Sequence, residues 1–129
     1  ESIAIVGASR TPGKVGHDIV ENIIQYGYEK AVYPINPRAS TICGQKSYPS
    51  LLDIPGTVDL AVIVVPSQSV LEVIDQCGEK SVDSAVIITA GFKESGTEGA
   101  RLERELIARA KKIVFGLLDQ IVSVSSTRI

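Results

Sequence analysis

A glycine-bearing loop near the start of the chain has the residue types of an anion-binding site. Gly7 follows an apolar run, and Ser9, Arg10 and Lys14 come before an apolar helical pattern that begins at Val15. A strand, a loop and a helix in this order leave unpaired N–H groups and the positive end of the helix dipole facing the loop. The loop therefore predicts phosphate binding. Since glycine permits close approach of backbone to phosphate, we expect a valine in place of Gly7 to block the ligand and leave most of the core intact.

Two common phosphate motifs are only partly matched by this loop. Gly13 and Gly16 have the second half of the dinucleotide spacing G-x-G-x-x-G, but Thr11 stands at its first glycine. The nucleotide P-loop fails as well, because Gly7 is one residue too distant and Val15 replaces the hydroxyl that binds magnesium. The residues thus favour neither a standard NAD site nor an NTPase. They favour a longer variant of a phosphate-binding loop, and the alternative is an ordinary strand-to-helix turn that binds no ligand.

A second candidate contact follows the next apolar strand, where Asn36, Pro37 and Arg38 stand together. A NAD-binding fold places an acidic residue here to hold the ribose hydroxyls. An arginine suits a ribose that carries a phosphate. The alternative is that Asn36 and Pro37 only make a turn and Arg38 is solvated.

Composition limits the classes of protein that fit. The 129 residues suffice for one domain with a core, and the net charge of −2 excludes a broad basic surface for nucleic acid. Cys43 and Cys77 are expected to be free thiols, and no carboxylate pair or metal cluster stands in the loops that would face a ligand. No signal peptide is visible, and the longest apolar run, Leu60–Val65, is too short to cross a membrane. We therefore expect a cytoplasmic protein without a metal site.

Strand and helix patterns alternate along the chain. Gly27 is the expected end of the first helix, and Ser69 with Glu72 forms a capping-box pattern at the start of the second, although Ser67 could serve as its cap. A short helical turn is expected after Pro49, and 113–129 is the least readable part. The expected strands are 3–6, 31–35, 60–65 and 84–88, with 113–115 and 121–124 as further candidates. The expected helices are 15–26, a second with the inner face Val70, Leu71, Ile74 and Cys77, and 97–112.

This alternation predicts an α/β fold, a doubly wound parallel sheet of about five strands in a single domain. In such a sheet the ligand lies beyond the carboxyl ends of the strands. Four loops converge at that edge, and each holds a small residue, a proline or a polar group: 7–10, 36–38, 65–67 and 89–92.

Several sequence blocks resemble one known family. They are the glycine-bearing stretch 5–16, Tyr-Pro-Ile-Asn-Pro at 33–37, Tyr-Pro-Ser at 48–50, the strand 58–66 and Ile-Thr-Ala-Gly-Phe at 88–92. In this order they are similar to the CoA-binding domain of ADP-forming (NDP-forming) acetyl-CoA synthetases, whose kin include the α subunit of succinyl-CoA synthetase. The resemblance covers about residues 2–112 and implies a Rossmann-like domain that binds coenzyme A.

The resemblance also implies where each part of coenzyme A would lie. The first loop would hold the phosphates, Arg38 would lie near the 3′-phosphate at the adenosine end, and two later loops would line the middle of the site and the pantetheine arm. The implied binding residues are Gly7, Ala8, Ser9, Arg10, Lys14, Val15, Asn36, Pro37, Arg38, Val65, Pro66, Ser67, Thr89, Ala90, Gly91 and Phe92.

In that family the full enzyme converts acyl-CoA, ADP and phosphate to the acid, CoA and ATP through a phosphohistidine. The resemblance implies that this histidine and the ATP-grasp domain lie outside residues 1–129, because His17 does not match the catalytic position. The chain would then be a non-catalytic fragment of an acyl-CoA synthetase, in a homo- or hetero-oligomer. It departs from the family after residue 115, where Gly116–Gln120 replaces Gly-Pro-Asn-Cys-x-Gly. The alternatives are a stand-alone CoA-binding regulatory module and an NADP-binding redox or sensor domain.

Overall fold

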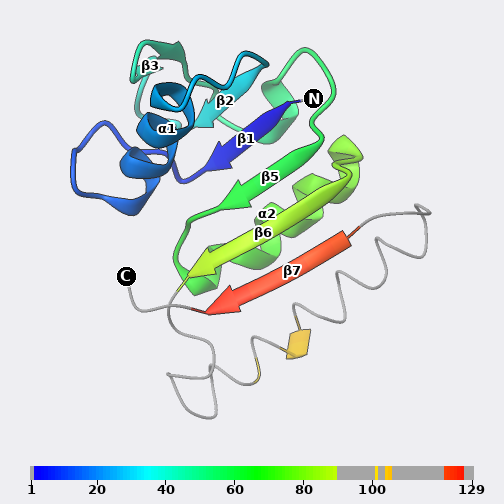
Figure 1. Ribbon diagram of the computed structural model, residues 1–129. Coiled ribbons are helices and arrows are strands. Elements are labelled where there is room, and N and C mark those ends of the chain that lie inside the picture. Colours follow the sequence, from blue (N-terminus) through cyan, green and yellow to red (C-terminus); the bar gives the residue numbers. More distant parts are fainter. Residues whose placement is uncertain (1, 90–100, 102–103, 106–120, 127–129) are drawn as a thin grey trace.

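A five-stranded parallel sheet forms the centre of the computed structural model, which describes residues 2–89, 101, 104–105 and 121–126 (Figure 1). After β1 the chain forms β2 on one side and then crosses back to form β5 on the other, so the strand order reverses between β1 and β5. The predicted doubly wound α/β fold is confirmed. In spatial order the strands are β2 (Val32–Ile35), β1 (Ile3–Val6), β5 (Leu60–Ile63), β6 (Ser84–Thr89) and β7 (Ile121–Ser126).

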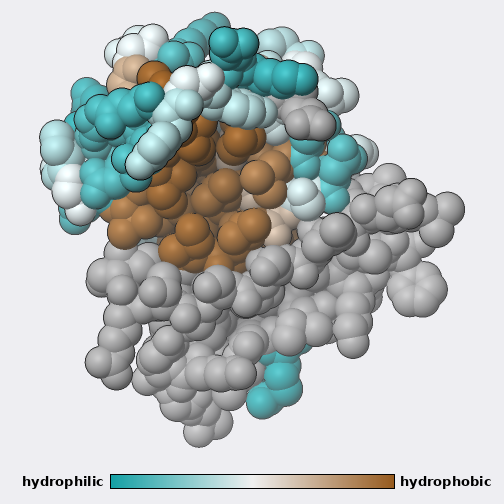
Figure 2. Space-filling view, viewed as in Figure 1, coloured by the Kyte–Doolittle hydropathy of each residue, from teal (hydrophilic) through white to brown (hydrophobic). Residues whose placement is uncertain are grey.

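Helices lie on both faces of this sheet (Figure 1). On one face, α1 (Val15–Gln25) packs beside the hairpin of β3 (Thr41–Ile42) and β4 (Gln45–Lys46). On the other face, α2 (Ser67–Lys80) packs with the 3-10 turn η1 (Leu51–Asp53). From the side drawn in Figure 1, polar residues cover the α1 region, and an apolar band crosses the middle of the described residues (Figure 2).

The side chains of β1 show why both faces of the sheet are covered by other elements. Successive side chains of a strand point to opposite faces, and Ala4 and Val6 pack with the α2 side whereas Ile5 packs with the α1 side. All three are buried. Burial of an aliphatic side chain such as Ile5 contributes about 1.5–3 kcal/mol, so an apolar strand of this kind is stable only between two layers.

The helix ends explain one confirmed and one wrong prediction. The first helix ends as predicted before Gly27, whose N–H donates to the Ile24 carbonyl at 3.1 Å. The second begins at Ser67, with Pro66 as its N-cap, so the capping box predicted at Ser69 is wrong. The strand before it stops early enough for Pro66 to turn the chain, and the backbone N–H of Ser69 already bonds the Pro66 carbonyl at 2.9 Å.

Other boundaries shift by a few residues. Strand β5 ends two residues earlier than predicted, β6 one residue later, and the turn after Ser50 is confirmed as η1. The β3–β4 hairpin was not predicted. The candidate strand 121–124 is part of β7, whereas the candidate strand 113–115 lies outside the described residues. Of the predicted helix 97–112, Arg101, Arg104 and Glu105 are described and are helical.

The helices in the described part of the chain are too short or too polar for one of them to cross a membrane.

Candidate functional site

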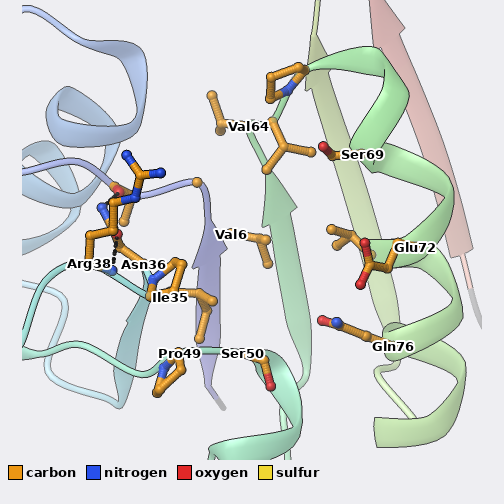
Figure 3. Close-up of a pocket in the computed structure, with 16 residues that line it drawn as sticks. Val6, Ile35, Asn36, Arg38, Pro49, Ser50, Val64, Ser69, Glu72 and Gln76 are labelled. Atoms are coloured by element: carbon orange, nitrogen blue, oxygen red, sulfur yellow. Dashed lines mark hydrogen bonds between the residues drawn. The ribbon is translucent and has the colours of Figure 1, made fainter.

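An open cavity of about 500 Å³ lies beyond the carboxyl ends of β1, β2 and β5 (Figure 3). It straddles the point between β1 and β5 where the strand order reverses. Open α/β sheets bind their ligands at this kind of switch point. The cavity is lined by Val6, Gly7, Ala8, Ile35, Asn36, Pro37, Arg38, Pro49, Ser50, Val64, Val65, Pro66, Ser69, Glu72, Val73 and Gln76.

Gly7 lies where the side of the cavity formed by β1 and β2 meets the side formed by the residues after β5. Its φ is +91°, and a Cβ at this position would stand 1.9 Å from the carbonyl oxygen of Val64. The backbone on either side is also bonded, because Gly7 N–H donates to the Ile35 carbonyl at 3.2 Å and Val64 N–H donates to the Val6 carbonyl at 2.7 Å. The expectation that a valine at Gly7 would spare the surrounding structure is therefore wrong, since the substitution collides with protein backbone before any ligand arrives.

A second close approach sets the first turn of α1 against the loop. A Cβ on Gly16 would lie 2.0 Å from the Gly7 carbonyl oxygen. This is the role of the last glycine in dinucleotide-binding turns, where the helix packs tightly on the strand. Gly16 therefore keeps the packing role of the last glycine in that pattern, because it lets the start of α1 lie close to the end of β1.

The loop after β2 is held in place by the side chain of Asn36. Its Nδ2 donates to the Ala8 carbonyl at 2.9 Å, and its Oδ1 accepts from the Arg38 backbone N–H at 2.8 Å. One amide therefore ties the first loop to the second and fixes the backbone that carries Arg38. The Arg38 side chain is exposed on the cavity wall, where an anionic ligand group can reach it.

The opposite wall comes from α2. Figure 3 shows Glu72 and Gln76 extending from this helix toward the ends of β1 and β5, on the other side of the cavity from Asn36 and Arg38. Ser69, Glu72, Val73 and Gln76 follow a helical i, i+3, i+4, i+7 spacing. These four residues were not predicted to line the site. Their helical spacing and the Pro49–Ser50 block are the sequence signals that could have indicated this wall of the cavity.

The predicted binding residues divide into three groups. Brought together in the cavity are Gly7, Ala8, Asn36, Pro37, Arg38, Val65 and Pro66. Outside the described lining are Ser9, Arg10 and Lys14 farther along the first loop and Val15 at the start of α1. Ser67 begins α2 and Thr89 ends β6, and the described residues do not include the side chains of these two. Outside the described residues are Ala90, Gly91 and Phe92.

The cysteines and His17 lie away from the cavity lining. Burial raises the pKa of the Cys77 thiol to about 12, and partial burial, helped by the negative charge of Glu21, raises the pKa of Cys43. Both side chains are therefore protonated thiols at neutral pH and poor nucleophiles. His17 is buried in the first turn of α1. The described lining of the cavity contains a positive side chain, Arg38, and a negative one, Glu72, and these groups suit ligand binding.

Comparisons with known proteins agree with this geometry. Residues 1–121 match the family described as "CoA binding domain". The chain is 48% identical over 112 residues to acetate–CoA ligase (ADP-forming) II of Archaeoglobus fulgidus, covering 87% of this chain and 17% of that protein. It is 46% identical over 116 residues to the α subunit of acetate–CoA ligase (ADP-forming) I of Pyrococcus furiosus, covering 87% of this chain and 25% of that subunit.

A solved structure shows the same fold. The dinucleotide-forming acetyl-coenzyme A synthetase 1 of Ca. Korarchaeum cryptofilum superposes with a TM-score of 0.83 at 49% identity, over 94% of this chain and 25% of that one. The chain thus spans a quarter or less of the length of these relatives. None of these matches favours the alternatives of an NADP-binding domain or a stand-alone module. With the family match over 121 residues and the cavity at the β1–β5 switch point, the chain belongs to the CoA-binding domains that occur in ADP-forming acetyl-CoA synthetases.

Proposed function

We propose that the cavity between β1, β2 and α2 holds coenzyme A and that the chain supplies the CoA-binding part of an ADP-forming acyl-CoA synthetase. The observation that carries the proposal is the switch-point cavity with Arg38 exposed on its wall. A volume of about 500 Å³ lies in the usual range for cofactor sites. An exposed guanidinium at this position suits a phosphorylated ribose.

Each part of coenzyme A would lie against a different part of the cavity and of the first loop. Arg38 would meet the 3′-phosphate, while Pro37 and the apolar residues of the cavity would contact the adenosine end. The diphosphate would follow the first loop, where Arg10 and Lys14 are exposed and available to it. The pantetheine arm would then pass Val65 and Pro66 toward the loop that follows β6. In this arrangement the charged half of the ligand lies on the β1–β2 side.

The reaction itself would need more protein than residues 1–129. We propose that acyl-CoA, ADP and phosphate are converted to the acid, CoA and ATP by the complete synthetase, with the phosphohistidine and the ATP-grasp domain supplied by the rest of the enzyme or by another subunit. The relatives support this division, because one is a single long protein and another is an α subunit. A cytoplasmic location and an oligomeric enzyme belong to the same proposal.

Calorimetric titration of the chain with CoA, 3′-dephospho-CoA and NADP in parallel tests the proposal. We expect CoA to bind with one-to-one stoichiometry, 3′-dephospho-CoA to bind more weakly and NADP to bind least. NADP binding without CoA binding would support a redox or sensor domain instead. A chain that is folded by circular dichroism but binds none of the three would contradict the assignment of the cavity.

A further inference from the structure

A cluster of three potential metal ligands lies on α1, outside the lining of the cavity. His17, Asp18 and Glu21 occupy positions i, i+1 and i+4 of the helix. The Nδ1 atom of His17 lies 3.4 Å from Asp18 Oδ1 and 3.5 Å from Glu21 Oε2. One ligand atom from each of the three residues lies within 4.8 Å of the other two. The three side chains therefore converge on one small volume.

The two separations from His17 Nδ1 match the spacing of ligands around an ion, and the two carboxylates lie within 4.8 Å of each other. At 3.4 Å, His17 Nδ1 and Asp18 Oδ1 are close enough for a long hydrogen bond when Nδ1 carries a proton, and metal binding requires that proton to leave. Tetrahedral zinc with bonds of about 2.0–2.1 Å has neighbouring ligand atoms about 3.3–3.4 Å apart, close to the 3.4 and 3.5 Å observed. His17 is only 9% exposed, so its ring is held in this position by the surrounding protein.

We propose that His17 Nδ1, Asp18 and Glu21 bind a divalent transition-metal ion of the zinc class. One imidazole and two carboxylates suit zinc, manganese, iron or cobalt, whereas calcium and magnesium prefer all-oxygen sets. The two carboxylates balance the charge of the ion and offset the positive end of the α1 dipole. Three protein ligands leave a fourth tetrahedral position for water or an anion.

Two contacts with neighbouring residues hold His17 and Asp18 in this arrangement. His17 Nε2 lies 3.6 Å from Cys43 Sγ, and the backbone N–H of Gly13 donates to Asp18 Oδ1 at 3.2 Å. Metal-binding histidines usually donate their second N–H to a neighbour, which fixes the tautomer. A hydrogen on Nε2 directed at Cys43 would leave the Nδ1 lone pair for the ion. The ion would thereby connect the start of α1 to the first loop and the β3–β4 hairpin.

The test is titration of the tag-free, metal-stripped 129-residue chain with zinc, cobalt and magnesium chlorides, followed by calorimetry. We expect one zinc or cobalt ion per chain and at least tenfold weaker binding of magnesium. Cobalt should give the visible absorption of a four-coordinate ion without a thiolate charge-transfer band. The Glu21→Gln variant should bind zinc at least tenfold more weakly, because Glu21 is half-buried and the change keeps its shape. Glu79→Gln, an exposed change on α2 of equal charge, should bind as the unmodified chain does.

Several results would overturn the proposal. One is the absence of stoichiometric zinc binding to a chain that is folded by circular dichroism. Equal zinc affinity in Glu21→Gln and Glu79→Gln is another. Loss of binding in Cys43→Ser together with retention in Glu21→Gln would place the ion on the sulfur side of His17. Since CoA titration is a separate measurement, failure of the metal site is distinguishable from failure of the proposed CoA site.

Discussion

The two sides of the cavity differ in charge and in construction. The strand wall, formed by Gly7, Ala8 and 36–38, consists of loop backbone and carries the positive Arg38. The helix wall, formed by 64–66 and one stripe of α2, is apolar near β5 and carries the negative Glu72. A ligand that fits both walls must place its anionic groups against the first and its uncharged part against the second. Coenzyme A, with its phosphates at one end and a long neutral arm, meets this requirement.

The two walls are also stabilised differently. Hydrogen bonds hold the strand wall, above all those that join the Asn36 side chain to Ala8 in the first loop and to Arg38 in its own loop. The helix wall depends on the core, because Val70, Ile74 and Cys77 on the inner face of α2 are buried against the sheet. The walls meet where Gly7 approaches the Val64 carbonyl. Substitutions in either wall should therefore change the affinity for the ligand, whereas a substitution at Gly7, where the walls meet, should lower the free energy of unfolding.

Replacement of Gly7 by alanine should have the largest effect, since it separates the walls. The φ of +91° costs an L-residue about 1–2 kcal/mol, and relief of the overlap with the Val64 carbonyl costs about 1–3 kcal/mol more. We expect the free energy of unfolding in urea to fall by about 2–5 kcal/mol, or the chain to fail to fold.

Gly13→Ala is the matched control for that experiment. Gly13 has a φ of +90°, but a Cβ there would meet nothing within 4 Å. Its cost should be limited to the backbone strain of about 1–2 kcal/mol. Equal losses of unfolding free energy in the two variants would contradict the close contact between Gly7 and β5.

The second prediction concerns the positive charge of the strand wall. Arg38→Ala should weaken CoA binding by about 1.5 kcal/mol, roughly tenfold in Kd, because a charge-assisted hydrogen bond to the 3′-phosphate is lost at an exposed position. Binding of 3′-dephospho-CoA should change little. Calorimetry with both ligands measures the difference, and an equal loss for the two would remove Arg38 from the 3′-phosphate.

The third prediction concerns the core beneath the helix wall. The pKa of Cys77 is raised to about 12 by burial, so the folded chain keeps its thiol proton when the unfolded chain, with a pKa near 9, has lost it. This contribution to stability is complete below pH 9 and is lost as the pH rises toward 12. Between pH 7.5 and 9.5 the unfolding free energy should fall by about 1 kcal/mol more in the unmodified chain than in Cys77→Ala. Parallel pH dependence in the two proteins would contradict the shift.

The architecture was predictable because the sequence pattern of the strands is clear. Continuous apolar runs such as 3–6 and 60–63 are typical of strands buried on both faces, and the turns between them fix the order. The carboxyl-edge location of the cavity then follows from topology. This is why the sequence predicts Gly7, Asn36, Arg38 and Pro66 at the site, and all four line the cavity.

Features set by tertiary contact could not be predicted in this way. The β3–β4 hairpin turns at Cys43-Gly44, both with positive φ, whereas Asn-Gly or Asp-Gly would have been recognised as a turn of this type. The stripe of α2 in the cavity was hidden because the Ser69–Glu72 pair also fits a capping box. The true role of Gly7 depends on Val64, which is distant in sequence and adjacent only across the sheet.

The smallest predicted effect comes from the negative charge of the helix wall. Glu72 is exposed and lines the cavity opposite Arg38, so its carboxylate repels the phosphates of CoA across solvent. Glu72→Gln should therefore strengthen CoA binding by about 0.5 kcal/mol at low salt, and the gain should shrink as ionic strength rises, because salt screens exposed charges. Glu79→Gln, which removes a negative charge from α2 outside the cavity lining, should have a smaller effect. Weaker binding of CoA by Glu72→Gln would instead mean that the carboxylate accepts a hydrogen bond from the ligand, and the helix wall would then take part in polar recognition as the strand wall does.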